Sequence, residues 1–171
     1  MRRYGTFRDR QGLDEATVYE VGGNDLFGEM APSHASLSEE RLRRRYDKDT
    51  REYEDDAPLR NLILGLNANP TARRAYIDQN VDKASVINAI AASAVIQHYD
   101  FGLKNYDLAL NEQGLWEIYP TDFDLTFGHR GNLECGSLCD SVFVGGAWEH
   151  PAQPLFAAFW FDPELSPLIR Q

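Results

Sequence analysis

The sequence predicts a single α+β domain that is mainly helical and carries one small β-hairpin. The first observation is an apolar stripe at helical spacing between residues 82 and 98, the strongest helix pattern in the chain. The second is a pair of strand-like runs, residues 106–110 and 115–119, joined by four residues. The third is the length, because 171 residues suit one domain with one hydrophobic core.

Shorter elements are expected in the first half of the chain. Residues 17–19 form a strand-like run that leads into a turn at residues 22–25. Residues 38–56 mix basic and acidic side chains, a pattern typical of a solvated surface. Apolar residues at helical spacing predict a helix over residues 59–66, and Asn69-Pro70 predicts the start of another, with a capping side chain followed by proline.

The second half contains the long helix, the hairpin and a final helix. Alanines in the helix over residues 82–98 allow close approach to neighbours, so we expect it to be central. Asn111-Glu112-Gln113-Gly114 joins the two strands, with glycine where a left-handed residue is wanted. Residues 154–161 predict an apolar helix, which belongs to the core or, in a truncated chain, forms an exposed patch.

Composition and charge exclude several classes of protein. The chain has 17 basic and 27 acidic residues, a net charge of −10, and no basic tract, which argues against binding to nucleic acid. It contains no apolar run long enough for a membrane span, and its start lacks the apolar run of a signal peptide. Cys135 and Cys139 are too few for a disulfide scaffold, and two buried thiols are favoured over a zinc site.

Acidic and amide residues bracket the predicted hairpin. Asp100 and Asn105 precede its first strand, and Asp122 and Asp124 directly follow its second strand. Because a hairpin returns the chain to where it left, we expect these four side chains to converge at one end. Carboxylate and amide oxygens are hard ligands, and such a cluster suits Mg²⁺ shared with substrate phosphates.

The order of these residues is the order that protein kinases use. An Asp accepts the proton of the attacking hydroxyl, an Asn five positions later holds a metal, and an Asp beyond a hairpin holds metal as well. Asp100-Phe101-Gly102 spells the kinase metal-binding tripeptide, but its place after a helix and before Asn105 makes it the catalytic-loop position. From the residues alone, turn capping, backbone hydrogen bonding and a solvated loop explain the same set equally well.

Residues 76–128 resemble the spore coat protein H (CotH) kinase family, which has an atypical protein-kinase-like fold. The family pattern is a helix that ends in an Asp, then Asn-Tyr, a hairpin, and an Asp-x-Asp motif before a glycine. The matching segments are His98-Tyr99-Asp100, Lys104-Asn105-Tyr106 and Pro120-Thr121-Asp122-Phe123-Asp124-Leu125-Thr126-Phe127-Gly128. Weaker similarity extends over about 150 residues, although the specific motifs are confined to some thirty of them.

The resemblance implies a role for each site residue. Asp100 corresponds to the catalytic Asp, Asn105 and Asp122 to residues that bind nucleotide and metal, and Asp124 to the second acid of the metal motif. The implied cofactors are ATP and Mg²⁺ or Mn²⁺. The implied activity is phosphoryl transfer to Ser or Thr of a coat or secreted protein, in the spore coat or another extracytoplasmic location.

Two departures from the family pattern affect this expectation. Thr121 stands where the family has Trp, so an aromatic contact to the nucleotide from this position is lost. The chain has three lysines and none before Lys48, so a phosphate-binding lysine on an early strand is missing. Residues 1–171 are therefore expected to be a partial kinase-like domain, the C-terminal lobe, without the upstream nucleotide-binding lobe.

Three functions remain open from the sequence. The first is phosphoryl transfer, which the set of four acidic and amide residues favours. The second is a non-catalytic kinase-like module for assembly or interaction, which the missing lysine and Thr121 favour. The third is a domain that binds a divalent cation and has no transferase role.

Overall fold

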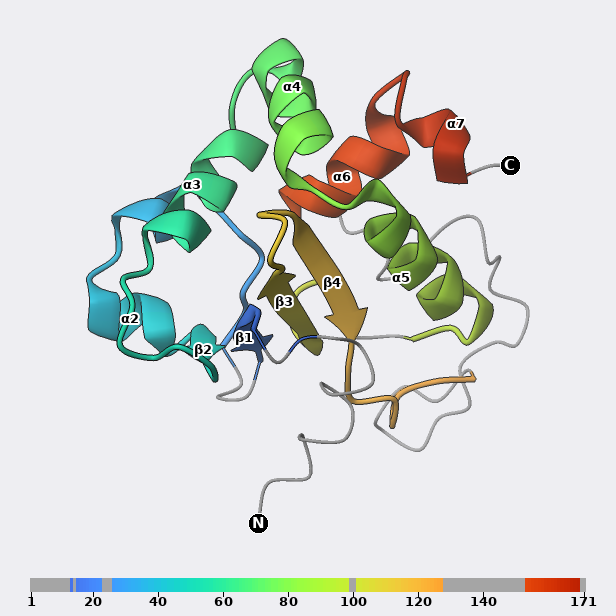
Figure 1. Ribbon diagram of the computed structural model, residues 1–171. Helices are drawn as coiled ribbons and strands as arrows, with labels where there is room; N and C mark the ends of the chain where they lie inside the picture. Colours follow the sequence, from blue (N-terminus) through green and yellow to red (C-terminus); the bar gives the residue numbers. More distant parts are fainter. Residues whose placement is uncertain (1–12, 14, 23–25, 99–100, 128–152, 170–171) are drawn as a thin grey trace.

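The computed structural model describes residues 13, 15–22, 26–98, 101–127 and 153–169. These residues form one antiparallel sheet with helices packed around it, so the predicted α+β class is confirmed (Figure 1). Of the described helices, none is long and apolar enough to cross a membrane.

The sheet has four strands in the order β2-β1-β3-β4, and each neighbouring pair is antiparallel. The strands are β1 (Thr17–Val21), β2 (Tyr46–Lys48), β3 (Tyr106–Leu110) and β4 (Trp116–Pro120). The predicted hairpin is β3–β4, but it does not stand alone as expected, because β1 pairs along the whole of β3. The expectation of a single small hairpin therefore understated the sheet.

The helices lie close to where their patterns predicted them. The Asn69 side chain accepts a hydrogen bond from the Ala72 N–H at 3.0 Å, and Asp82 accepts one from Ser85 N–H at 3.0 Å, so both act as caps. The helices are α2 (Glu39–Arg43), α3 (Ala57–Leu66), α4 (Pro70–Asn80), α5 (Lys83–Val95), α6 (Pro154–Phe161) and α7 (Ser166–Ile169), with a 3₁₀ turn, η1 (Pro32–Ser36). The sequence did not predict η1, α2 or α7.

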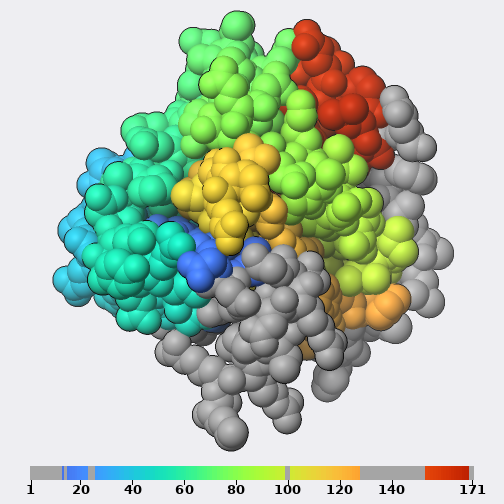
Figure 2. Space-filling view, viewed as in Figure 1, coloured from blue at the N-terminus to red at the C-terminus, as the bar shows by residue number. Residues whose placement is uncertain are grey.

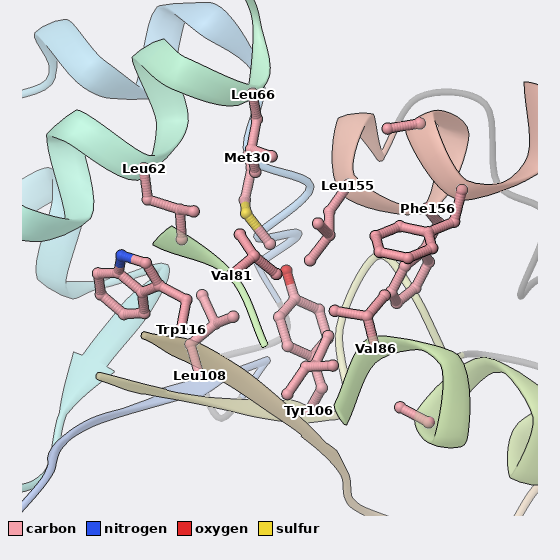
Figure 3. Packing of buried hydrophobic residues seen from close by; sticks show 14 of the residues in the cluster. Met30, Leu62, Leu66, Val81, Val86, Tyr106, Leu108, Trp116, Leu155 and Phe156 are labelled. Atoms are coloured by element: carbon pink, nitrogen blue, oxygen red, sulfur yellow. The ribbon is translucent and has the colours of Figure 1, made fainter. Parts of the chain in front are cut away.

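The main core lies between one face of the sheet and the helices (Figure 3). Strand residues Tyr106, Leu108 and Trp116 are buried there against side chains from α3, α5 and α6. The apolar helix α6 belongs to this core, although its last residue, Phe161, is 65% exposed. Alternate strand residues face the other way, where Leu13, Ala16, Val18 and Ala109 form a smaller buried cluster.

Helix α5 lies at the outer edge of β4, whereas the sequence predicted a central position for it. The Asp82 N–H donates to the Trp116 carbonyl at 2.9 Å. The Ser85 hydroxyl accepts from the Ile118 N–H at 2.9 Å and donates to the Ile118 carbonyl at 3.1 Å. These contacts satisfy backbone groups that an edge strand leaves open. Figure 2 shows the tip of the β3–β4 hairpin (yellow) at the surface, beside the green helices.

The charged segment over residues 38–56 is not simply the solvated surface that its composition predicted. Lys48 and Asp56 are only 3% and 4% exposed. Lys48 Nζ donates to the carbonyl oxygens of Glu54 and Asp55, and lies 3.5 Å from Asp56 Oδ1. Asp56 also accepts from Arg43 Nε at 2.8 Å and from the Tyr19 hydroxyl at 3.1 Å. The segment of mixed charge therefore contributes to a buried ionic network that includes residues of β1 and β2.

Candidate functional site

Asn105 and Asp122 lie at the same end of the β3–β4 hairpin. Asn105 immediately precedes β3, and Thr121 immediately follows β4. The Thr121 N–H donates to the Asn105 carbonyl at 2.9 Å, which continues the ladder by one residue beyond Tyr106 and Pro120. Asp122 is the next residue along the chain. The structure thus brings together the predicted amide and the first predicted acid of the metal motif.

Asn105 is held tightly from both sides. Its N–H donates to the Val21 carbonyl at 2.8 Å, which joins it to the end of β1. A Cβ on Gly22 would lie 2.7 Å from Lys104 Cβ and 3.4 Å from Asn105 Oδ1, and Gly22 has a φ of +109°. Only glycine fits this close approach without strain. Asn105 is 7% exposed. Its backbone hydrogen bonds to Val21 at the end of β1 and to Thr121 just after β4 fix its position.

Asn105 and Asp122 share an uncommon backbone conformation. Their φ values are 61° and 54°, in the left-handed region that residues other than glycine seldom adopt. Asn and Asp tolerate this region best among such residues, because their short polar side chains can bond locally. Left-handed residues cluster at functional sites, where the surrounding structure maintains the strain. Two of them at one end of a hairpin mark this end as a candidate site.

Asp122 and Asp124 are both exposed to solvent. Asp124 lies in the turn that follows Asp122, and the Thr126 hydroxyl closes that turn by donating to the Phe123 carbonyl at 2.8 Å. The Phe127 N–H donates to the Ile96 carbonyl, so the loop returns to the C-terminal end of α5. The loop is therefore anchored at both ends, with its carboxylates facing water.

His98 fixes the position of the Asp122 backbone, which the sequence did not reveal. Its ring is fully buried, and Nε2 lies 2.8 Å from the Asp122 carbonyl oxygen. Because a carbonyl only accepts, Nε2 carries the proton. The ring stacks on Phe101 at a centroid distance of 5.6 Å, and the tilted ring of Phe123 packs against it at 5.1 Å. The sequence favoured a packed or capping histidine, and the only hint of more was its place two residues before Asp100.

Of the tripeptide at residues 100–102, the structure describes Phe101 and Gly102. Phe101 is fully buried, and its ring lies 4.9 Å from that of Phe156 in α6, so it is a core residue. Asp100, the predicted catalytic residue, lies outside the described residues, as do Cys135 and Cys139. The assignment of Asp100 stays a prediction.

The donor atoms present suit a hard cation that also binds other ligands. The Asn105 amide oxygen and the Asp122 carboxylate are oxygen donors of the kind that Mg²⁺ takes. Within the described ranges, no group of three or more His, Cys, Asp or Glu side chains could hold a metal ion. A complete all-protein cage is therefore not formed by these residues. Such a small donor set fits Mg²⁺, which keeps several waters and binds substrate phosphates.

The fold and the site define a class of protein: an α+β protein in which an Asn and an Asp lie at the same end of a β-hairpin. A family model described as CotH kinase protein matches residues 5–170. The chain therefore belongs to the CotH kinase protein family, and the family that the sequence resembled is confirmed.

A named relative supports the same assignment. The chain is 30% identical over 121 residues to the inner spore coat protein H of Bacillus subtilis (strain 168). The match covers 70% of this chain and 33% of the relative. The chain thus spans about a third of the length of this relative.

Proposed function

We propose that this chain supplies the metal-binding and hydroxyl-orienting part of a phosphoryl-transfer site that uses ATP. The observation that carries the proposal is the hydrogen bond from Thr121 N–H to the Asn105 carbonyl, which places Asn105 beside Asp122. Membership of a family described as CotH kinase protein supports phosphoryl transfer as the reaction class. The geometry supports the proposal because the backbones of Asn105 and Asp122 lie at the same end of the hairpin.

Each residue has a distinct task in this proposal. Asn105 and Asp122 would hold Mg²⁺ or Mn²⁺ together with the nucleotide phosphates, and Asp124 would act as a further acid in the same loop. The bound cation would neutralise charge on the transferred phosphoryl group. Asp100 would orient the attacking Ser or Thr hydroxyl and accept its proton. His98 would keep the Asp122 backbone in place.

The relative suggests the setting of this activity. It is described as an inner spore coat protein, so we propose a spore coat location for this chain and a coat or secreted protein as its substrate. Lys48 does not provide the phosphate-binding lysine, because its ammonium group is buried and bound to Glu54, Asp55 and Asp56. A partner lobe that grips the phosphates is therefore part of the proposal.

Thermal unfolding tests the metal and nucleotide site. Mg·ATP should raise the melting temperature more than Mg²⁺ or ATP alone, because a ligand of the native state stabilises it. Asp122→Asn should abolish this increment and leave the melting temperature of the free protein nearly unchanged. Asp78→Asn, a change at an exposed acid on α4, is the matched control and should keep the increment. An increment that survives Asp122→Asn would remove Asp122 from the site.

Turnover tests the assignment of Asp100. Asp100→Ala should spare the affinity for Mg·ATP and remove turnover, because this residue acts on the transition state more than on nucleotide binding. The chain alone should have almost no activity, since no early lysine holds the phosphates. Joined to the upstream part of the Bacillus relative, it should become active only with Asp100 intact. Activity that survives Asp100→Ala would refute the catalytic role.

A non-catalytic assembly module is the second candidate. Thr121 in place of the family's Trp and the structural use of Lys48 favour it. Phe123 and Phe127, in the loop after β4, are 53% and 69% exposed, as an interaction surface would be. Failure of Mg·ATP to change the melting temperature, together with no activity in the joined protein, would favour this module.

A further inference from the structure

We infer that a hollow beside α2 binds a phosphate group, at a site separate from Asn105 and Asp122. Its lining residues are Leu26, Leu37, Arg41, Arg44 and Arg45, and its volume is about 190 Å³. This inference does not depend on the proposed function, because the two sites share no residue.

The side chains of residues 41–45 point in different directions from the turn that they form. Leu42 is fully buried in the core. Arg43 is bound to Asp56 at 2.8 Å and to Glu39 at 2.9 Å. The other three arginines stand at positions i, i+3 and i+4, which share one face of a helical turn. A basic stretch that is mixed with acids in the sequence thus places three arginines beside one hollow.

The charges around the hollow favour an anion. The chain as a whole has a net charge of −10, yet the described residues that line the hollow include three arginines and no Asp or Glu. Arg41 and Arg45 form no ion pair with any residue that the structure describes. Like charges this close repel each other, and an anion would relieve that repulsion.

One of these arginines is held in place without losing its charge. Arg45 Nη1 donates to the Phe27 carbonyl at 2.6 Å, which fixes the guanidinium group at the hollow. The remaining N–H groups of a guanidinium form a planar fork that matches phosphate oxygens. Leu26 and Leu37 supply an apolar wall, and electrostatic attraction is stronger beside such a wall than in open water.

The size of the hollow limits the ligand. A volume of about 190 Å³ lies below the roughly 300–1,000 Å³ typical of pockets for whole small molecules. A phosphate group, with the carbon atom that carries it, is the ligand that fits. The source is a phosphorylated Ser or Thr of a protein or a free phosphate ion, and both offer the same dianion to the arginines.

Binding of a short fluorescent peptide with one phosphoserine, in low salt without Mg²⁺, tests the inference. The phosphopeptide should bind, and its unphosphorylated form should not. Arg41→Gln should weaken binding, and Arg41→Gln with Arg45→Gln should weaken it by about tenfold or more. Arg73→Gln, on α4, and Asp122→Asn should leave binding unchanged, the latter because the two sites are separate.

Competition with inorganic phosphate distinguishes a phosphorylated protein from a free phosphate ion as the ligand. Inorganic phosphate that displaces the peptide only at high concentration would support a phosphorylated protein as the ligand. Phosphate that binds with the same arginine dependence, while the peptide does not, would support a free anion. Equal binding of the phosphorylated and unphosphorylated peptides, or full binding by the double variant, would overturn the inference. Arg41 is exposed and its side chain makes no hydrogen bond to a described residue, so the single variant should fold normally.

Discussion

The His98 ring donates from Nε2 to the carbonyl oxygen of Asp122 at a distance of 2.8 Å. This bond joins the segment after α5 to the loop after β4, two parts of the chain 24 residues apart. Both rings that flank the imidazole, Phe101 and Phe123, come from the connections around the hairpin. The Asp122 backbone therefore depends on one buried side chain that has no contact with solvent.

Replacement of His98 by Phe should separate packing from hydrogen bonding. The phenyl ring would keep the aromatic contacts but lack the N–H, so His98→Phe should cost about 1–3 kcal/mol in the free energy of unfolding. The increment in melting temperature from Mg·ATP should fall as well, because Asp122 is no longer fixed. His98→Gln, which retains an N–H donor, should restore part of the increment. Equal increments in His98→Phe and the unsubstituted chain would show that the bond does not position Asp122.

Loss of the Lys48 ammonium group should destabilise the protein strongly. Lys48→Met leaves Asp56 buried with one cation fewer, and breaking a buried ion pair costs about 3–5 kcal/mol. Arg43 and Tyr19 still bind Asp56, so we expect the lower end of this range. Denaturant unfolding measures the change. Lys83→Met, at an exposed pair with Asp78, should change stability by at most about 0.5 kcal/mol.

Stability should fall on mild acidification because of His34. Burial, helped by Arg45 and opposed by Glu29, lowers the pKa of the His34 imidazole below its ordinary value of 6.5. Its Nδ1 lies 2.9 Å from the Tyr46 hydroxyl, which also accepts from Met30 N–H, so the hydroxyl donates to a neutral ring. The unfolded chain therefore takes up a proton first, and the free energy of unfolding decreases as the pH falls below about 6.5.

Comparison of His34→Gln with the unsubstituted chain isolates the contribution of His34 to the loss of stability. Urea unfolding between about pH 7 and pH 5 should show a shallower loss of stability in His34→Gln than in the unsubstituted chain. The same slope in both proteins would assign the loss to other groups.

Removal of the Ser85 hydroxyl should expose the edge of β4. Ser85→Ala leaves both the N–H and the carbonyl of Ile118 without their partner, at a cost of about 1–3 kcal/mol. Ser36→Ala, where an exposed hydroxyl donates to the Ser33 carbonyl, should cost much less. Hydrogen exchange at the Ile118 amide provides a second measurement, and unchanged protection there would contradict the role of Ser85.

Much of the fold could be predicted because its signals are local. The periodic stripe and the cap at Asn69 mark helices in the sequence itself, and a connection with Gly114 marks the hairpin. Strand β2 has only three residues, and its Lys48 is buried through backbone carbonyls that no sequence pattern displays. The charged segment was therefore interpreted as surface.

One relationship within the candidate site was predictable, and the roles of its residues stay predictions. That Asn105 and Asp122 meet follows from the return of a hairpin, which is a property of the chain path. The contribution of His98 does not follow, because its partner is a backbone carbonyl, a group present in every residue. The tight packing of Gly22 on Asn105 depends on β1, which is more than 80 residues away in the sequence.

The closed outer edge of β4 restricts how copies of this chain can assemble. One end of the sheet is covered by α5 through Asp82 and Ser85, so no strand from another molecule can extend it there without displacing that helix. The other end is β2, which offers three residues with the exposed carboxylate of Asp47 at their centre. Short, charged edges resist strand addition. Within the described sheet, neither edge favours pairing with a strand of another molecule. Copies of this chain would therefore associate through contacts between side chains on their surfaces.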